Sequence, residues 1–200
     1  MRTHLRKIIL PFFWIAFFVS GCIEEPVKED VPELITKVKL IFTSTTGGGI
    51  IEATATDPDG EGIQDLKTDG VIVLPKGHSY SLSISLLNEL ADITSPEYNI
   101  TDEVQEEGSE HMIFFSWTDG LFASPTGNGN VDNRQDAVNY EDADSNGFPI
   151  GLTTNWTALA NPVTGTFRII LKHQPELKSP TSGVDIGETD LDVTFDIEVQ

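Results

Sequence analysis

The clearest strand signal in the chain is the stretch LDVTFDIEV, residues 191–199. Its odd-numbered residues are all apolar, and its even-numbered residues are Asp, Thr, Asp and Glu. Successive side chains of a β-strand point to opposite faces, so this alternation predicts a strand with one buried and one solvated face. The stretch SYSLSISLL, residues 79–87, alternates in the same way. Both stretches are typical of antiparallel sheets that cover a core on one side.

Six more segments have the composition of strands. They are residues 34–43, 50–56, 71–74, 111–117, 152–157 and 164–173. The first two read as a hairpin around a Gly-rich turn, and 111–117 is so apolar that both of its faces are expected to be covered. About eight short strands and many Gly/Pro turns predict an all-β fold, an antiparallel β-sandwich of immunoglobulin-like or jelly-roll-like type.

Two segments between these strands do not read as strands. Residues 101–107 are expected to form a short helical turn, with Thr101 as its cap and Gly108 as its stop. Residues 120–151 form a long stretch rich in Asn, Gly, Asp and Ser. A loop of this length in a compact domain is usually functional or disordered.

The N-terminus has the layout of a secretory signal. Three basic residues precede the apolar run 8–19, which is too short to span a bilayer. The following residues, Val19-Ser20-Gly21-Cys22, resemble a bacterial lipobox. This resemblance implies cleavage before Cys22 and attachment of lipid to its thiol, which would anchor the protein in a membrane. The expected parts are a signal peptide (1–21), the lipidated Cys with an acidic linker (22–34) and one β-sandwich domain (35–200).

The composition narrows the classes of function. Cys22 is the only cysteine, so the exported part would have no disulfide, no catalytic thiolate and no Cys-zinc site. Removal of residues 1–21 takes away three basic and no acidic residues, which leaves 9 basic against 32 acidic residues and a formal charge of −23. Such a field repels nucleic acid and favours cations and basic partners. High surface solubility is the alternative explanation of this charge.

Two loops have the spacing of calcium ligands. Asp142, Asp144, Asn146 and Gly147 match positions 1, 3, 5 and 6 of an EF-hand loop, although Thr153 stands where its bidentate Glu is expected. Asp57 and Asp59 precede Gly60 in a shorter version of the pattern. Alternate oxygens can surround a hard cation such as Ca²⁺, but the same residues also build Asx turns without a metal.

Three histidines of the exported part lie at strand ends. His78, His111 and His173 each continue the apolar face of their strand. If the strands 111–117 and 164–173 pair antiparallel, His111 and His173 become neighbours at one rim. Together with His78, Glu107 and Glu110 they form a candidate site for Zn²⁺ or Cu²⁺. The alternative is three histidines that cap strand ends through ordinary hydrogen bonds.

Catalysis finds little support in the sequence, and no enzymatic activity is expected. There is no GxSxG nucleophile elbow, no GxGxxG and no P-loop. Trp117 and Trp156 have the aromatic character of a sugar-binding platform, but such residues are more often part of the core.

Several motifs together resemble an uncharacterised family of Bacteroidota lipoproteins. They are LLNE (86–89), EHMIFF (110–115), DADSNGFPIGL (142–152) and LKHQP (171–175), and the acidic Glu24 and Glu25 resemble the surface-export signal of such lipoproteins. Members often carry a type 1 periplasmic binding fold label. That label implies a large protein of two α/β lobes, and this chain has neither the length nor the helices for such a fold. The resemblance implies a partner of TonB-dependent receptors.

These observations lead to one main functional hypothesis and two alternatives. The first is a lipoprotein of the outer membrane, exposed at the cell surface or on the periplasmic side, that binds a ligand, with a metal ion the best single candidate, for nutrient uptake. The second is a structural or adhesive module with stabilising calcium loops. The third is a carbohydrate-binding module.

Overall fold

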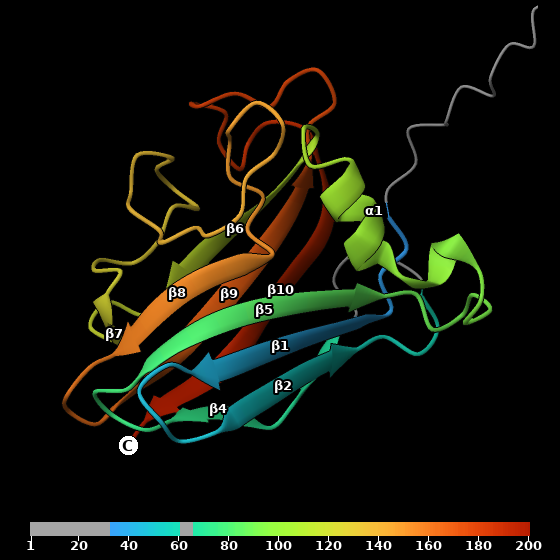
Figure 1. The fold of residues 1–200 in the computed structure, drawn as a ribbon. Coiled ribbons are helices and arrows are strands. Elements are labelled where there is room, and N and C mark those ends of the chain that lie inside the picture. The colour runs from blue at the N-terminus through green and yellow to red at the C-terminus, as the bar shows by residue number, and fades with distance from the viewer. Residues whose placement is uncertain (1–32, 61–65) are drawn as a thin grey trace, which may run out of the picture. The chain divides into compact units, whose positions relative to one another are not determined.

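The strands lie in two sheets, and the computed structural model of the protein describes residues 33–60 and 66–200. The six-stranded sheet contains, in spatial order, β3 (Lys67–Asp69), β2 (Ile50–Thr56), β1 (Lys37–Ser44), β5 (Ser79–Leu87), β8 (Thr153–Ala158) and β7 (Phe122–Ser124). The four-stranded sheet contains β4 (Val71–Leu74), β10 (Glu188–Val199), β9 (Val163–His173) and β6 (His111–Trp117). The sheets pack face to face (Figure 1), which confirms the predicted all-β sandwich.

The strand count and one strand direction differ from the prediction. The described residues contain ten strands rather than about eight, because β3 and β7 have only three residues each, too few to show an alternating pattern. β4 runs parallel to β10, so a purely antiparallel sandwich is wrong for this pair. The chain leaves the larger sheet at β3, turns at Gly70, whose φ is 78°, and enters the smaller sheet as β4 beside the last strand.

The N-terminal predictions lie outside the described residues. This applies to the signal peptide 1–21, to Cys22 and to the linker as far as residue 32. Within residues 33–60 and 66–200, no helix is both long and apolar enough to cross a bilayer.

The core follows the alternation read from the sequence. The odd-numbered residues 191–199 of β10 and the even-numbered residues 80–86 of β5 are all buried between the sheets. An aromatic group fills one end of the core, where the ring centroid of Trp156 lies 4.7 Å from that of Phe122 and 5.0 Å from that of Trp117. Trp117 and Trp156 are therefore core residues, and neither is exposed as a sugar platform.

The predicted loop 120–151 contains the short strand β7, and the part that follows β7, residues 125–151, covers the edge of β6. Asn130, which is fully buried, exchanges hydrogen bonds with Phe115: its backbone N–H donates to the Phe115 oxygen at 2.9 Å, and its Oδ1 accepts from the Phe115 N–H at 3.0 Å. Its Nδ2 donates to the hydroxyl of Tyr140, which itself donates to the backbone oxygen of Ile113. The loop thus satisfies backbone groups that an open edge strand would expose. The segment also shields Phe114 on the outer face of β6, since the guanidinium of Arg134 lies 6.0 Å from that ring.

Asn130→Ala is expected to lower the free energy of unfolding by about 2–3 kcal/mol. Two buried groups, the N–H of Phe115 and the hydroxyl of Tyr140, lose a partner, and each unsatisfied group costs about 1–3 kcal/mol. Urea unfolding measures this loss. Asn133→Ala is the matched control, because the Asn133 side chain bonds only within the exposed part of the same loop. Equal effects of the two substitutions would contradict the role assigned to Asn130.

The predicted helical turn is present as α1 (Ile100–Glu106), preceded by the 3₁₀ turn η1 (Pro96–Tyr98). Its buried residues, Ile100 and Val104, are four residues apart and face β5. Thr101 is not the cap, since the N-cap is Asn99, which makes no side-chain capping bond. The Thr101 hydroxyl bonds instead to the backbone N–H and oxygen of Leu86, which fastens α1 to the end of β5.

Candidate metal centre

Two histidines lie side by side at one rim of the four-stranded sheet. β6 begins at His111, β9 ends at His173, and the antiparallel register pairs the two residues directly. Their rings are stacked, with centroids 4.6 Å apart and planes 8° from parallel. Both residues are buried. The expectation that His111 and His173 become neighbours at one rim is confirmed by this register.

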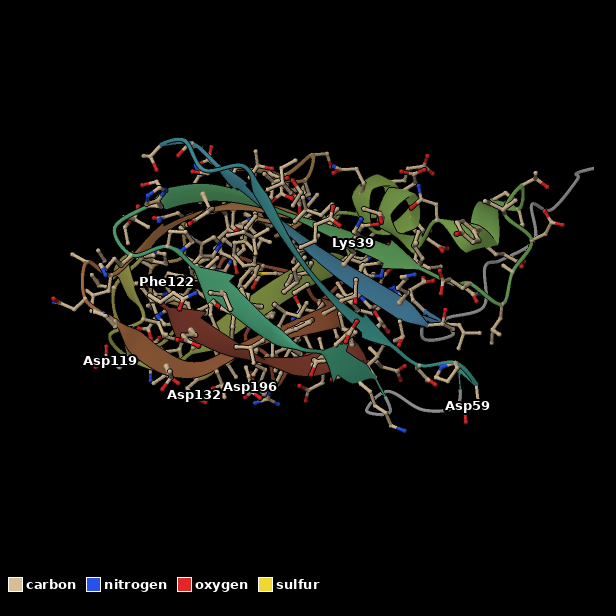
Figure 2. The ribbon with its side chains drawn as sticks, turned by 90° about the horizontal axis from the view of Figure 1, so that it is seen from below. Lys39, Asp59, Asp119, Phe122, Asp132 and Asp196 are labelled. Carbon is tan, nitrogen blue, oxygen red and sulfur yellow. The ribbon has the colours of Figure 1, made fainter. Side chains whose placement is uncertain are left out.

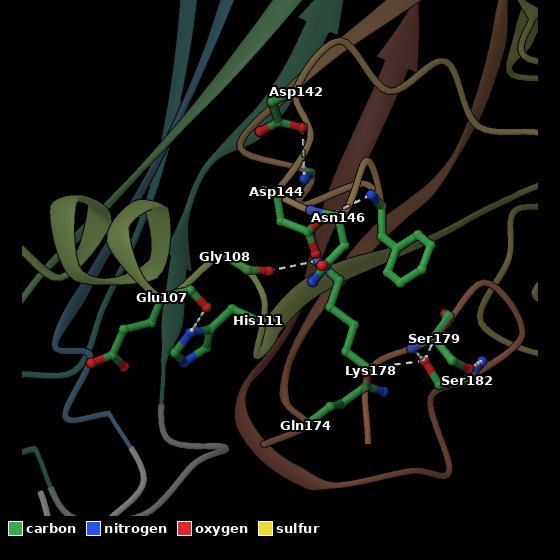
Figure 3. Close-up of polar contacts among 12 residues, drawn as sticks. Glu107, Gly108, His111, Asp142, Asp144, Asn146, Gln174, Lys178, Ser179 and Ser182 are labelled. Carbon is green, nitrogen blue, oxygen red and sulfur yellow. Dashed lines mark hydrogen bonds and ion pairs between the residues drawn. The ribbon is translucent and has the colours of Figure 1, made fainter. Parts of the chain in front are cut away.

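A hydrogen bond to the backbone indicates the tautomer of His111. Its Nδ1 lies 3.2 Å from the backbone oxygen of Glu107, which directly follows α1 (Figure 3). A carbonyl oxygen only accepts hydrogen bonds, so Nδ1 carries a proton and the neutral ring has its lone pair on Nε2. Histidines that bind a metal through one nitrogen commonly donate their other N–H to a carbonyl or carboxylate. His111 is oriented as such a ligand would be.

A β-bulge brings Asp190 to the same place. In the register of β10 and β9, Thr189 pairs with Lys172 and Leu191 pairs with Leu171, so Asp190 is an extra residue between them. A bulge of this kind redirects the side chain of the added residue. Asp190 and Leu191 are consecutive, yet both are buried, which an unbroken strand with one solvated face would not allow.

The carboxylate of Asp190 faces His111 in a dry environment. Asp190 is 3% exposed, and its Oδ2 lies 3.8 Å from Nε2 of His111. Neither oxygen makes a hydrogen bond of good geometry within the described residues, although the backbone of Glu33 lies close enough to lower the pKa. Burial raises the pKa of Asp190 to about 6, while the charge of His173 acts in the opposite direction. A carboxyl group buried at this energetic cost is typical of functional sites.

Two glutamates form the more open side of the cluster. Oε2 of Glu110 lies 3.4 Å from Nε2 of His173, and the Glu110 side chain is 40% exposed. Glu107, His111 and His173 can each offer one ligand atom, and these atoms lie within 4.8 Å of one another. Glu107 also belongs to a second group of this kind, with Glu33 and Glu103. The structure therefore brings together four of the five residues expected to bind a transition metal.

His78 is the fifth, and it lies at the other end of the sandwich. Its backbone oxygen accepts from Ala158, which pairs with Phe122 beside the far end of β6. Six residues of β6 separate that end from His111, which corresponds to roughly 20 Å. The grouping of His78 with His111 and His173 is therefore wrong. Its ring instead stacks on Tyr80, with centroids 6.5 Å apart.

The loop with the closest calcium-type spacing bonds to the protein itself. Oδ1 of Asp144 accepts from the backbone N–H groups of Asn146 and Phe148 at 2.8 and 2.9 Å, and Oδ2 lies 2.9 Å from Nζ of Lys178 (Figure 3). The carboxylate of Asp142 accepts from the N–H groups of Gly151 and Thr153. Burial alone would raise the pKa of Asp144, but Lys178 and the backbone donors outweigh it and lower the pKa. A lysine ammonium thus stands beside the carboxylate where a metal-binding loop would place its cation.

The shorter loop is an Asx turn. Oδ1 of Asp57 accepts from the N–H groups of Asp59 and Gly60, both at 3.1 Å. A hydrogen bond from Asp59, followed by the one from Gly60, lowers the pKa of Asp57. Gly60 has a φ of 72°, which suits glycine at this turn. The geometry at Asp57 and Asp59 is therefore that of an Asx turn, which forms without a metal and was the alternative to a calcium site.

Asp190 is the functional candidate that the sequence did not reveal. In strict alternation with Leu191 it would face solvent, and only the bulge turns it inward. Lys172 is a second buried polar residue near it, with Nζ donating to Thr189 at 2.8 Å and burial lowering its pKa. No signal in the sequence marks this bulge.

Asp190→Asn is expected to stabilise the metal-free protein at pH 7.5 by up to about 3 kcal/mol. The pKa of Asp190 is raised in the folded state, so folding is favoured most below pH 4 and this contribution is lost as pH rises through about 6. Urea unfolding in EDTA at pH 4.5 and 7.5 measures the effect. Asp192→Asn is the control and should destabilise, because both oxygens of Asp192 accept from Arg168 at 2.8 and 2.7 Å. Destabilisation by Asp190→Asn at pH 7.5 would contradict the assigned environment.

Similarity to known proteins assigns no family to this chain. No protein-family model matches it. No curated protein and no solved structure shows significant similarity to it.

Proposed function

We propose that this protein is a lipid-anchored, exported protein that captures a transition-metal ion, Zn²⁺ or Cu²⁺, for uptake across the outer membrane. Its metal site consists of His111, His173 and Asp190, with Glu107 and Glu110 on the open side. The protein is an accessory binding protein and performs no catalysis of its own.

The observation that carries this proposal is the pairing of His111 with Asp190. Their Nε2 and Oδ2 atoms are 3.8 Å apart in a dry site, which is too long for a hydrogen bond. Two ligands on one tetrahedral zinc ion, with bonds of about 2.0–2.1 Å, lie roughly 3.4 Å apart. A movement of a few tenths of an ångström would therefore bring both atoms onto one ion.

The ligand types favour a borderline metal over a hard one. Two imidazoles and a carboxylate are common ligands of Zn²⁺ and Cu²⁺, whereas Ca²⁺ and Mg²⁺ prefer oxygen ligands throughout. The rings of His111 and His173 are stacked and buried, and their adjacent strands bring both imidazoles to the same place.

The position of the site at the rim suits a transported ion. Glu110 is partly exposed, and Glu107 is half-buried, so the cluster reaches solvent on one side. The negative charge of the exported part raises the local concentration of cations. Export and anchoring at Cys22, and delivery to a TonB-dependent receptor, rest on the signal sequence and on the family resemblance.

Metal titration of the purified protein tests this function. We expect one Zn²⁺ or Cu²⁺ ion per chain in competition with a chromophoric chelator, together with a higher melting temperature than in EDTA. The affinity should fall as the pH is lowered, because protons compete with the metal for the histidine ligands. Absence of binding by both ions would contradict the proposal.

A further inference from the structure

The stacking of the two histidines limits how they can share one metal ion. The ring planes of His111 and His173 are 8° from parallel, and their centroids are 4.6 Å apart. The lone pair of an imidazole nitrogen lies in the plane of its ring, so a metal binds in that plane. Two nearly parallel planes that are separated by a stack do not meet near the rings. One ion therefore binds both histidines only if one ring turns out of the stack.

Each histidine has a carboxylate of its own. Oδ2 of Asp190 lies 3.8 Å from Nε2 of His111. Oε2 of Glu110 lies 3.4 Å from Nε2 of His173. Both separations exceed that of a good hydrogen bond, and both are close to the roughly 3.4 Å between two ligands on one tetrahedral zinc ion. The cluster thus contains two histidine–carboxylate pairs with the spacing that a metal ion needs.

The backbone of Glu110 fixes its position beside His173. The Glu110 N–H donates to the backbone oxygen of Glu107 at 2.8 Å, and the Glu110 oxygen accepts from the N–H of Gln174 at 2.6 Å. Gln174 directly follows His173, so this second bond fastens the start of β6 to the end of β9. The fold therefore determines where Glu110 lies, although its side chain is 40% exposed.

Glu107 lies within reach of both pairs. One carboxylate oxygen of Glu107 and one nitrogen of each histidine lie within 4.8 Å of one another. Figure 3 shows the Glu107 side chain beside the ring of His111. A carboxylate can bridge two metal ions through its two oxygens, and the ions of two-metal sites lie about 3.5–4 Å apart. The separation of the stacked rings is only slightly larger than this distance.

We propose that the cluster binds two transition-metal ions rather than one. His111 and Asp190 hold the first ion, which is buried. His173 and Glu110 hold the second ion, which lies on the open side of the cluster. The carboxylate of Glu107 bridges the two ions. With two ions bound, both rings keep their stacked positions, and the three carboxylates offset most of the positive charge.

This inference rests on the proposed function and extends its cargo from a single ion to a pair. The first ion is the tight one that a chelator competition counts. While it is bound alone, His173 can turn its ring to reach it. The second ion binds more weakly, because its ligand Glu110 is partly exposed and because the two ions repel each other.

Isothermal titration calorimetry of the purified protein with Zn²⁺, and separately with Cu²⁺, tests for the second ion. We expect two equivalents, the second with a dissociation constant at least about tenfold higher than the first. Glu110→Gln is expected to raise the dissociation constant of the second equivalent by about tenfold or more, because it removes the anionic ligand. The first equivalent should stay within about threefold of its native affinity.

Asp119→Asn is the matched control. Glu110 directly precedes β6, and Asp119 follows β6 after one residue, so the control removes one carboxylate from the other end of the same strand. Asp119 is exposed, and Figure 2 shows it at the end of the sandwich away from α1. Both equivalents should keep their dissociation constants within about twofold of the native values.

Electron paramagnetic resonance of the Cu²⁺-loaded protein distinguishes a pair of ions from two separate sites. With one equivalent, the spectrum should be that of isolated Cu²⁺. With two equivalents, the neighbouring spins should couple, so that the signal per copper falls or a half-field line appears. Glu110→Gln should lose this coupling, whereas Asp119→Asn should retain it.

The outcomes separate this inference from the proposed function. Absence of any bound ion would overturn both. A single equivalent without a second would overturn the pair and leave the proposed function intact. Two equivalents whose spins do not couple would place the second ion elsewhere on the acidic surface and would overturn the inference. Equal loss of the second equivalent in Glu110→Gln and Asp119→Asn would do the same.

Discussion

Replacing His111 with alanine is expected to lower the affinity for Zn²⁺ and Cu²⁺ by more than about 100-fold. The change removes Nε2, the atom nearest to Asp190, and it also removes the ring that stacks on His173. His173→Ala should have a similar effect, because the same cluster loses its second imidazole. Competition titration with a chromophoric chelator at pH 7.5 measures both variants.

His78→Ala is the matched control for this experiment. It removes a histidine of the same fold, but at the far end of the sandwich, so the affinity should be unchanged. Native affinity in both the His111 and the His173 variant would contradict the proposed site. Loss of affinity in all three histidine variants would point to a general effect on folding.

The buried position of His111 makes a second kind of variant necessary. Alanine leaves a cavity at a fully buried residue and can destabilise the protein by itself. Asp190→Asn keeps the shape of the side chain and is expected to stabilise the metal-free protein, yet it removes the anionic ligand. Weaker metal binding in a more stable protein would separate the loss of a ligand from the loss of the fold.

Metal binding should also appear as added stability of the native protein. A ligand that binds only the folded state contributes about 2.7 kcal/mol when its concentration is 100 times the dissociation constant. This gain should be absent from His111→Ala and His173→Ala. It should be retained in His78→Ala, where the cluster is intact.

The sequence predicts the strands in which buried and exposed side chains alternate regularly. The alternation in residues 79–87 and 191–199 identifies both central strands and their buried faces, because a half-buried strand must repeat every two residues. β3 and β7 are too short to show a period. The direction of β4 depends on where the chain crosses between sheets, which no local pattern contains.

The candidate site was also predictable only in part, because some of its contacts do not depend on a periodic pattern of side chains. His111 and His173 could be paired because two long apolar strands fix the register between them. Asp190 depends on one extra residue in β10, and Lys178 reaches Asp144 from a loop more than thirty residues further along the chain. Contacts made by bulges and by distant loops leave no period in the sequence.

Loss of the ion pair between Lys178 and Asp144 is expected to have the second large effect, a decrease in the free energy of unfolding. Both side chains are 1% exposed, and Nζ of Lys178 lies 2.9 Å from Oδ2 of Asp144 and 2.6 Å from the backbone oxygen of Gly108. Lys178→Met is expected to lower the free energy of unfolding by about 3–5 kcal/mol, because it leaves a buried carboxylate without its counter-ion. Urea unfolding in EDTA measures the loss.

Two comparisons make this expectation specific. Lys39→Met removes the partner of Glu52 from an exposed pair, which is 3.0 Å long, and should cost at most about 1 kcal/mol. The double variant Lys178→Met/Asp144→Asn should recover much of the lost stability, since no charge is then left buried. A loss as small as that of Lys39→Met would contradict the buried role of Lys178.

The same variants decide between the two explanations of the Asp142 loop. With Lys178 present, its ammonium already occupies one side of the Asp144 carboxylate, and backbone N–H groups occupy the other. Calcium should therefore leave the melting temperature of the native protein unchanged, while in Lys178→Met it should restore part of the lost stability by replacing one cation with another. If calcium instead stabilises the native protein and Asp144→Asn abolishes that gain, the loop is a calcium site, and the structural module with stabilising calcium becomes the better account of this loop.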